Sequence, residues 1–341
     1  KAELEKNEVF ENEEIILTEE ITNAKPLPLP FVKTEIVAPA FIDFGVKAEV
    51  NKEGLCGIPS VFSLKGREKC RRVRKIRCYR RGMFEMGAST LYGCDLFGIG
   101  GFALNAAEGG VKLTVLPTPL EAEDFFPDNR QFFGEITVRR FICEDPFLVK
   151  GAREYTGREP MNAISWTATA RAGKLMALNK DFTTAAKILI LLNFQRRDDF
   201  FIPASDEVCE LMIKAAAFAM ERAEEIGAEF ALAMNVTSDR LSYFGSGSDF
   251  KLEQLRRLAA VNADCRLKTE DFLRERKHSG FTDLIFITPS LSPDSTDYIA
   301  GLRERGFGVM AYSLRNEAES EFCSRIVRRV ERKKEEKSEK L

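Results

Sequence analysis

The spacing of apolar residues changes near residue 185, and this change constrains the fold of the 341-residue chain more than any other feature. Before it, apolar residues come in short β-branched runs such as Ile15–Leu17, separated by turn residues. After it, Ile188–Leu192 is a continuous aliphatic run, typical of a strand buried on both faces. From Ser205, a good helix N-cap, apolar residues recur at helical spacing until Gly227, where the helix should end. The first half is therefore expected to be β and the second half α/β.

The expected strands of the first half are short and broken by Pro and Gly. Besides the run above they are Val32–Val37, Val46–Val50, Cys70–Tyr79 and Val111–Leu116. A β-sandwich-like module over residues 1–120 accounts for them.

Strands and helices alternate in the second half. Strands are expected at Phe230–Val236, Leu284–Ile287 and Val309–Tyr312, and helices at 205–227, 250–261, 270–277, 294–305 and around Phe322, Ile326 and Val330. Such alternation predicts a doubly wound, mostly parallel sheet over 181–330, joined to the β module by a linking segment, 121–180, and followed by a charged tail, 331–341. The expected fold class is α+β multidomain, with a β-sandwich-like module followed by a doubly wound α/β domain.

Composition limits the function classes. The 51 basic and 53 acidic residues nearly balance, which argues against nucleic acid as a partner. No apolar run reaches the length of a membrane span. The sequence begins at Lys1 rather than Met, so we expect an upstream signal, anchor or vector-encoded stretch to have been removed. The eight cysteines form no C-x-x-C pair and lie in apolar runs, which favours free thiols over zinc ligands or disulfides.

Positive charge is concentrated in one run. Arg67–Arg81 holds nine cations around a single Glu68, whereas residues 1–66 contain no Arg. As a strand, the run would point cations to both faces. Three interpretations remain open: contact with anionic lipid, contact with an acidic partner, or pairing with the acidic N-terminal module. The residues concerned are Arg71, Arg72, Arg74, Lys75 and Arg77.

Residues 151–178 form the most distinctive segment. Pro160 suits the first turn of a helix, Gly173 suits its end, and Leu175–Leu178 suits a following strand. On that helix Trp166 and Ala170 would share one face with Gly173.

This segment resembles the hallmark of the bacterial "domain of unknown function 58" family. The matching residues are Arg153, Glu154, Tyr155, Ile164, Trp166, Ala170, Arg171, Gly173 and Leu175. Other similar stretches are Arg81-Gly82-Met83-Phe84, Asp95-Leu96-Phe97-Gly98, the strand ending at Pro117, and the turn from Asn23 to Pro30. The sequence departs from the family pattern at Arg158, Glu159 and Asn162.

The resemblance implies a C-terminal half similar to a von Willebrand factor A domain. Such domains often bind Mg²⁺ through D-x-S-x-S after the first strand and an Asp after a later one. Here those positions are Asn193, Gln195 and Arg197, with Ser290 at the later one. Since a hard cation needs anionic oxygen ligands, a degenerate site without metal is expected, and no cofactor is predicted.

The known catalytic templates fit poorly. There is no G-x-S-x-G elbow and no P-loop, and the one histidine, His278, lies in a basic helix end. We interpret the signature residues Arg153, Glu154, Tyr155, Glu159, Trp166 and Arg171 as a structural clamp between two domains. An enzyme using Tyr155, Glu159 or Arg171 is kept as an alternative.

The sequence thus predicts a non-catalytic interaction protein. Members of the resembled family usually carry two upstream transmembrane helices and are associated with MoxR-type AAA+ ATPases. The resemblance therefore implies a membrane-tethered adaptor with a cytoplasm-facing soluble part and a role in the cell envelope or in complex assembly. An extracytoplasmic binding module is the other alternative, and it would have paired cysteines.

Overall fold

The computed structural model describes residues 1–46, 50–52, 54–94, 101–105, 110–120, 132–136, 149–157, 164–180, 186–197, 200–203, 205–236, 243–262, 271, 280–291 and 293–313. The chain forms two compact units, which are treated separately below. Unit 1 comprises Lys1–Thr118 and Leu252–Asn262, and unit 2 comprises Pro119–Lys251 and Ala263–Leu341. Among the described residues, no helix is both long enough and apolar enough to cross a membrane.

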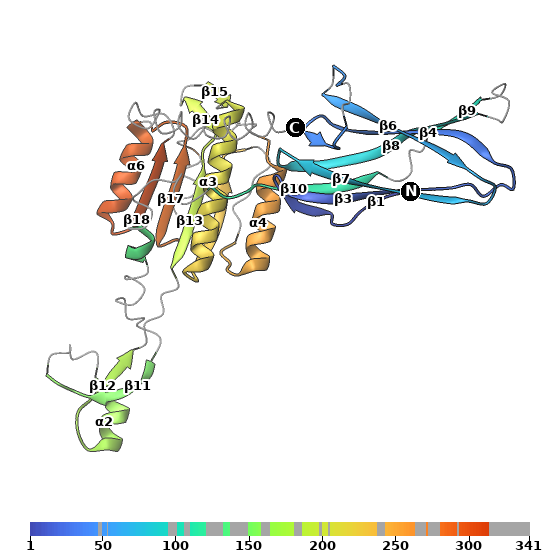
Figure 1. Cartoon of the computed structure of the whole chain (residues 1–341). Coiled ribbons are helices and arrows are strands. Elements are labelled where there is room, and N and C mark those ends of the chain that lie inside the picture. The colour runs from blue at the N-terminus through green and yellow to red at the C-terminus, as the bar shows by residue number, and fades with distance from the viewer. Residues whose placement is uncertain are drawn as a thin grey trace. The chain divides into compact units, whose positions relative to one another are not determined.

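Unit 1 contains a β-sandwich (Figure 1). One sheet has the order β1-β3-β7-β5, with β1 (Ala2–Leu4), β3 (Glu14–Thr22), β7 (Lys69–Cys78) and β5 (Ile42–Asp43). The other has the order β2-β10-β8-β4-β6, with β2 (Glu8–Phe10), β10 (Val111–Leu116), β8 (Gly82–Cys94), β4 (Leu29–Pro39) and β6 (Leu55–Leu64), and β9 (Gly101–Asn105) paired to β8. Among the described strands of this unit, only β2 and β10 pair in parallel.

Alternation of side chains explains why these strands form two layers. In β4, buried residues alternate with half-buried ones from Val32 onward, so every second side chain faces the other sheet. Ile15 and Ile76 from one sheet pack with Ile58 and Val115 from the other in a single hydrophobic cluster. The sandwich predicted for residues 1–120 is therefore present, as are strands at four of the five predicted runs.

Two predictions for this unit were incomplete or wrong. The strand predicted at Val46–Val50 is absent among its described residues, where Val46 is exposed and Val50 makes only an isolated bridge to Cys56. Strand β6 was not predicted, because Gly57 and Pro59 lie in its centre. Pro59 has no backbone N–H to donate. It is tolerated because β6 is an edge strand of its sheet, and the outward side of an edge strand needs no donor.

Asn23 organises the turn that leads into β4. It is buried, and its side-chain amide donates to the carbonyls of Leu27 (2.8 Å) and Lys65 (2.9 Å). Its oxygen accepts from the N–H of Lys25 (3.1 Å). This conspicuous stretch of the sequence therefore has a structural role, because it ties the turn to the loop that connects β6 of one sheet to β7 of the other.

Arg81, at the end of the basic run, is buried against the last turn of α4 (Ser248–Ala260) within unit 1. Its Nη1 donates to the carbonyls of Leu258 (2.7 Å), Ala259 (3.2 Å) and Val261 (3.0 Å). A cation at the carboxyl end of a helix supplies donors to carbonyls that have no partner in the helix. Gly82 follows with φ +151°, and a Cβ there would lie 2.2 Å from the Phe84 ring, so only glycine fits.

Unit 2 contains a four-stranded parallel sheet of order β16-β13-β17-β18. Its strands are β13 (Lys187–Leu192), β16 (Glu229–Met234), β17 (Asp283–Thr288) and β18 (Gly308–Ser313). Helix α3 (Asp206–Glu225) connects β13 to β16 and ends before Gly227, whose φ is +64°, and α6 (Pro293–Glu304) connects β17 to β18. A short antiparallel hairpin, β14 (Gln195–Arg197) with β15 (Phe200–Pro203), follows β13 directly.

The signature segment forms an antiparallel pair with one short helix. Strand β11 (Val149–Glu154) pairs with β12 (Met176–Lys180), and α2 (Trp166–Ala172) precedes β12. The helix ends at Gly173 in the left-handed conformation, as predicted. Its predicted start at Pro160 was wrong, because the helix begins after Ser165, whose Oγ accepts from the N–H of Ala168. Ile164 lies outside the helix in a β-bridge to Ala177.

The predicted fold class was wrong. A doubly wound α/β domain of the von Willebrand factor A type was expected over 181–330, whereas the chain is rich in sheet and most of its described strand pairings are antiparallel. Among the described residues, the parallel sheet of unit 2 has the four strands β16, β13, β17 and β18. Periodicity predicted the single elements of this region, but it carries no information on how many strands share a sheet or in which direction they pair.

Several predictions lie outside the described residues. These are the helix at 270–277 except Asp271, the helix around Phe322–Val330, and the charged tail 331–341.

Candidate functional site

The predicted degenerate metal position lies at the carboxyl end of the parallel sheet. Asn193 follows β13 and is buried, as are Gln195 and Asn235. The Asn193 amide donates to Thr288 Oγ1 (3.0 Å) at the end of β17, and Asn193 Oδ1 accepts from the Asn235 amide and from the N–H of Gln195 (3.2 Å). Asn235 Oδ1 in turn accepts from the N–H of Phe194 (2.7 Å).

These neutral groups satisfy one another, so the cluster connects the ends of three strands. Ser290 is half-buried and takes part through its carbonyl, which accepts from Thr288 Oγ1 (2.9 Å). Arg197 lies in β14, and its side chain is outside the described part of the chain. Among the described residues, no group of three or more His, Cys, Asp or Glu is placed to hold a metal ion.

The signature residues lie at the surface. Arg153, Glu154, Trp166 and Arg171 are exposed and Tyr155 is half-buried, while Glu159 falls outside the described residues. Glu154 pairs with Lys174 (2.9 Å). No residue of α2 is buried, and 65% of the Trp166 side chain is exposed. That these residues clamp two domains together stays a prediction.

Helix α2 has two distinct sides. Ala168 and Thr169 are half-buried, and Thr169 Oγ1 accepts from the N–H of Met176 in β12 (3.0 Å). Trp166, Ala170 and Gly173 are exposed together on the face that the sequence predicted for them. The helix therefore displays a large aromatic ring beside small residues.

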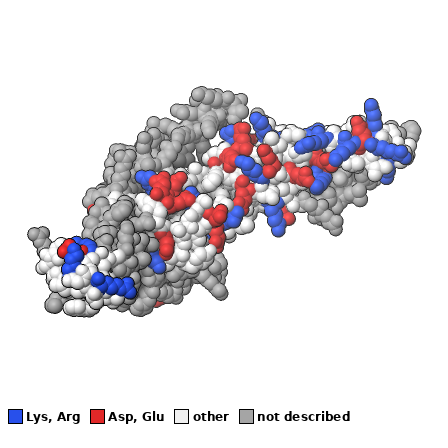
Figure 2. Space-filling model, turned by 90° about the horizontal axis from the view of Figure 1, so that it is seen from below, with Lys and Arg blue, Asp and Glu red and all other residues white. Residues whose placement is uncertain are grey.

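The basic run forms β7, whose cations point to both faces as expected. On the outer face, Arg77 and Lys75 pair with Glu14 of β3, the latter at 4.0 Å, and Arg71 Nη2 lies 3.5 Å from Thr18 Oγ1. Opposite charges on neighbouring strands stabilise a sheet modestly. Figure 2 shows Lys and Arg interspersed with Asp and Glu over the coloured part of the sandwich, so this face carries no patch of one sign.

On the inner face, Arg72 and Arg74 reach the opposite sheet. Arg72 Nη2 donates to the Val61 carbonyl in β6 (2.9 Å), and its guanidinium lies 4.3 Å from the Phe62 ring centre. Arg74 belongs to a buried layer of polar residues. Each of the five cations thus contacts a group of its own chain. At the end of β7, burial raises the pKa of the Cys78 thiol to about 12.

A layer of four polar residues crosses the sandwich interior, one from each of four strands: Glu19 in β3, Thr34 in β4, Ser60 in β6 and Arg74 in β7. Ser60 Oγ donates to Glu19 Oε2 (3.1 Å), Arg74 Nε donates to the same oxygen (3.3 Å), and Arg74 Nη2 donates to Ser60 Oγ (2.8 Å). The layer separates the main hydrophobic cluster from a smaller one, which is formed by Val32, Phe62 and Leu64.

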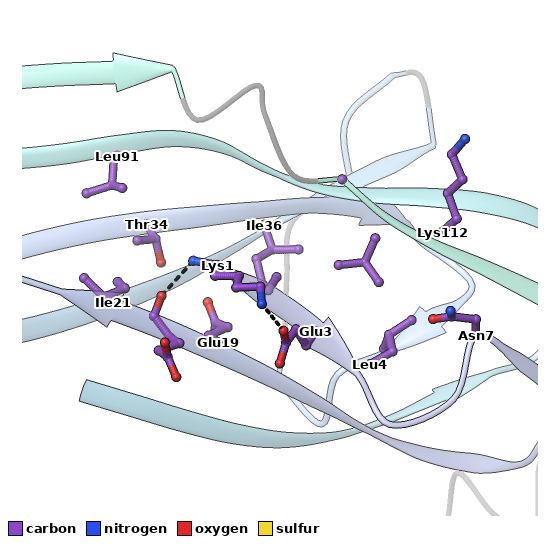
Figure 3. Close-up of a pocket in the computed structure, with 14 residues that line it drawn as sticks. Lys1, Glu3, Leu4, Asn7, Glu19, Ile21, Thr34, Ile36, Leu91 and Lys112 are labelled. Atoms are coloured by element: carbon purple, nitrogen blue, oxygen red, sulfur yellow. Dashed lines mark hydrogen bonds and ion pairs between the residues drawn. The ribbon is translucent and has the colours of Figure 1, made fainter. Parts of the chain in front are cut away.

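A groove of about 770 Å³ opens beside β1 and leads to this layer. Residues of β1, β3, β4, β8 and β10 line it. Figure 3 shows Glu19 and Thr34 in its wall together with Ile21, Ile36 and Leu91. Thr34 Oγ1 is buried and has no hydrogen-bond partner among the described residues.

Sequence reasoning missed this groove, although a signal for it exists. The inward positions of β3 run Ile15, Leu17, Glu19, Ile21, so a carboxylate interrupts an apolar alternation. Buried carboxylates are rare and require partners. The partners lie on other strands, which the sequence alone does not place.

No family model matches the sequence, and no curated protein matches it. The CARDB domain of the PF1109 protein from Pyrococcus furiosus is similar in structure, with 13% identity over 33% of this chain and 87% of that one, at a TM-score of 0.22. A cohesin module of a Clostridium perfringens family 33 glycoside hydrolase gives 11% identity, 34% and 96% coverage, and a TM-score of 0.26. The seventh ScaB type I cohesin of Pseudobacteroides cellulosolvens has 14% identity over 34% of this chain and 92% of that one, at a TM-score of 0.23. None of the three is a von Willebrand factor A domain, and TM-scores this low establish neither a shared fold nor a shared function.

Proposed function

We propose that the protein is a non-catalytic interaction protein, a membrane-tethered adaptor that works with a MoxR-type AAA+ ATPase in cell-envelope or complex-assembly processes. The observation that carries the proposal is the exposed face of α2, with Trp166 beside Ala170 and Gly173. The partner and the tether come from the family resemblance of the same segment.

The composition of the exposed face of α2 suits a binding surface. A seven-residue helix without buried side chains contributes little to its own stability, because helices of that length depend on packing. Tryptophan and arginine are the residue types most enriched among side chains that dominate protein–protein binding, and both are exposed here as Trp166 and Arg171. Small residues beside a tryptophan allow a partner to approach the ring closely.

The cysteines favour a reducing compartment. Cys56, Cys70, Cys78 and Cys209 are free thiols. An extracytoplasmic module would be expected to pair such residues, so the free thiols favour a cytoplasm-facing soluble part over the extracytoplasmic alternative.

The proposal is tested by capture from the native host. The intact, membrane-anchored protein is purified with and without ATP, as wild type and as Trp166→Ala, and the co-purifying proteins are identified by mass spectrometry. We expect a MoxR-type ATPase with the wild type and at least about a tenfold lower yield with Trp166→Ala, because truncation of a central aromatic commonly costs 2 kcal/mol or more, roughly thirtyfold in affinity.

Leu27→Ala is the matched control, since Leu27 is 68% exposed and Trp166 is 65% exposed. It should retain the ATPase at the wild-type level. Recovery of no AAA+ ATPase in either nucleotide state would overturn the adaptor function. Equal recovery by Trp166→Ala would instead overturn the assignment of α2 as the binding surface.

A further inference from the structure

Two oxygen atoms of the polar layer have no hydrogen-bond partner in the part of the chain that the structure describes. Both hydrogen bonds that Glu19 accepts fall on Oε2, and no described residue donates to Oε1. Thr34 is only 6% exposed, and its hydroxyl has no partner among the described residues. Glu19 itself is 5% exposed, and both residues line the groove. Burial of a polar group such as the Thr34 hydroxyl is unfavourable unless a hydrogen-bond partner reaches it.

Apolar side chains line part of the groove, and charged side chains, among them Lys1, Glu3, Glu20 and Lys112, line the rest. Leu4, Ile21, Ile36 and Leu91 contribute to the lining, and all belong to strands of the two sheets. A volume of about 770 Å³ lies within the range of ligand-binding clefts. The groove therefore offers both apolar and charged side chains, with an acceptor and a hydroxyl in its interior.

One rim of the groove is a strand edge. Among the described strands, β1 is the outermost of its sheet and pairs only with β3. The reciprocal hydrogen bonds of Lys1 with Glu20 (2.7 Å and 2.8 Å) make these two residues a hydrogen-bonded pair. In an antiparallel ladder the next residue, Ala2, then points its N–H and carbonyl away from β3. Ala2 lines the groove, so its backbone can pair with an added strand.

We propose that this groove binds an extended peptide segment of a partner protein. The peptide adds to the edge of β1 through backbone hydrogen bonds at Ala2. Its alternate side chains cover the apolar wall, and one of them, carrying an N–H or O–H donor, hydrogen-bonds Glu19 Oε1 and Thr34 Oγ1. Strand addition gives affinity through the backbone, and pockets for alternate side chains give specificity.

The test uses the full chain and a phage-displayed library of random peptides of about twelve residues, roughly 40 Å when extended. Peptides selected on the wild type are synthesised, and their Kd is measured by calorimetry on wild type and variants. Thr34→Val removes the hydroxyl and keeps the shape of the side chain. Ala2→Pro removes the outward N–H of the edge, where proline is tolerated.

Thr18→Val is the matched control for Thr34→Val. Thr18 precedes Glu19 in β3 and lies on the opposite, outer face, where Arg71 approaches it at 3.5 Å. The control should bind the selected peptides as the wild type does. Thr34→Val and Ala2→Pro should each raise Kd at least about tenfold, the equivalent of 1.4 kcal/mol. The Tm of Thr34→Val should not fall, since the lost hydroxyl has no partner among the residues that the structure describes.

Selected peptides should alternate apolar residues around a residue with a side-chain donor. Recovery of no peptide that binds the wild type would overturn the proposal. Peptides that bind Thr34→Val and Ala2→Pro as tightly as wild type would overturn it as well. In that case the Thr34 hydroxyl and the edge of β1 would not contact the peptide. The outcome is independent of the adaptor function, because Trp166→Ala leaves this groove intact.

Discussion

The basic strand β7 and the signature helix α2 are both rich in residues that often mark binding surfaces, yet the structure treats them in opposite ways. In β7, Arg74 is inserted into the sandwich interior and Arg77 pairs with Glu14. In α2, no side chain is buried, and the Trp166 ring is exposed.

The difference follows from what lies beside each element. Strand β7 lies between two other strands, and β3 presents Glu14, Thr18 and Glu19 opposite or diagonal to its cations. Among the described residues, helix α2 lies beside the two-stranded pair β11–β12, and none of its side chains is buried there. Arginine and tryptophan therefore indicate a binding surface only where their side chains are exposed and do not pack or pair within their own chain.

The strongest test of this contrast is removal of Arg74. Arg74→Leu leaves the buried Glu19 carboxylate without its cation, and we expect the free energy of unfolding to fall by about 3 to 5 kcal/mol in urea titrations. Lys75→Ala, one residue further on the outer face, should change it by less than about 0.5 kcal/mol. The triple variant Arg74→Leu/Glu19→Leu/Ser60→Ala should regain most of the loss, because no charge is then left unpaired. If Arg74→Leu matched the wild type, the layer would not be a coupled network.

Substitution of Arg81 tests whether the end of the basic run also stabilises the fold. Arg81→Ala removes three charge-assisted hydrogen bonds to carbonyls at the end of α4, and the expected loss in the free energy of unfolding is about 2 to 3 kcal/mol. The exposed neighbour Arg80 provides the control, and Arg80→Ala should cost less than about 0.5 kcal/mol. Equal stability of the two variants would contradict the structural role of Arg81.

The burial of Cys78 at the end of β7 can be tested by measuring the free energy of unfolding as a function of pH. Burial raises the pKa of its thiol from 9.0 to about 12, so the folded state binds the proton more tightly than the unfolded state. The contribution to stability is complete below about pH 9 and is lost as pH rises toward 12, at no more than about 1.4 kcal/mol per pH unit. Urea titrations between pH 8 and about pH 10.5 should show wild type losing this stability relative to Cys78→Ala. Parallel pH profiles would mean that the thiol is accessible in the folded protein.

The smallest effects are expected in the signature segment. Lys174→Ala breaks an exposed ion pair with Glu154, and Trp166→Ala truncates an exposed ring, so each should change the free energy of unfolding by less than about 0.5 kcal/mol. Thermal and urea unfolding measure both variants. A loss above about 2 kcal/mol for Trp166→Ala would support the clamp predicted from the sequence and weaken the binding role proposed for α2.

Local elements of the fold were predictable because their signals are local. The helical spacing after Ser205 and the stop at Gly227 correspond to α3, and the apolar run Ile188–Leu192 corresponds to β13. Strand β6 escaped prediction because Pro59 is compatible with a strand only at a sheet edge, and edge position is a property of the whole sheet. The start of α2 was misplaced because Pro160 and Ser165 are both acceptable near a helix N-terminus, and pairing of Ile164 with Ala177 selects the later one.

The sequence by itself determined the positions of α3, of β13 and of four of the five strands expected in the first half. It also determined that basic residues alternate along β7 and that amides stand where a metal site would need carboxylates. Only the tertiary structure decided the direction of strand pairing, and with it the predominantly antiparallel fold. It also decided which cations pair with neighbouring residues and that the side chain of Trp166 is exposed to solvent. The layer formed by Glu19, Thr34, Ser60 and Arg74 likewise depends on the tertiary structure. The physical reason is that periodicity depends on residues close in the chain, whereas burial and pairing depend on which distant strand lies opposite.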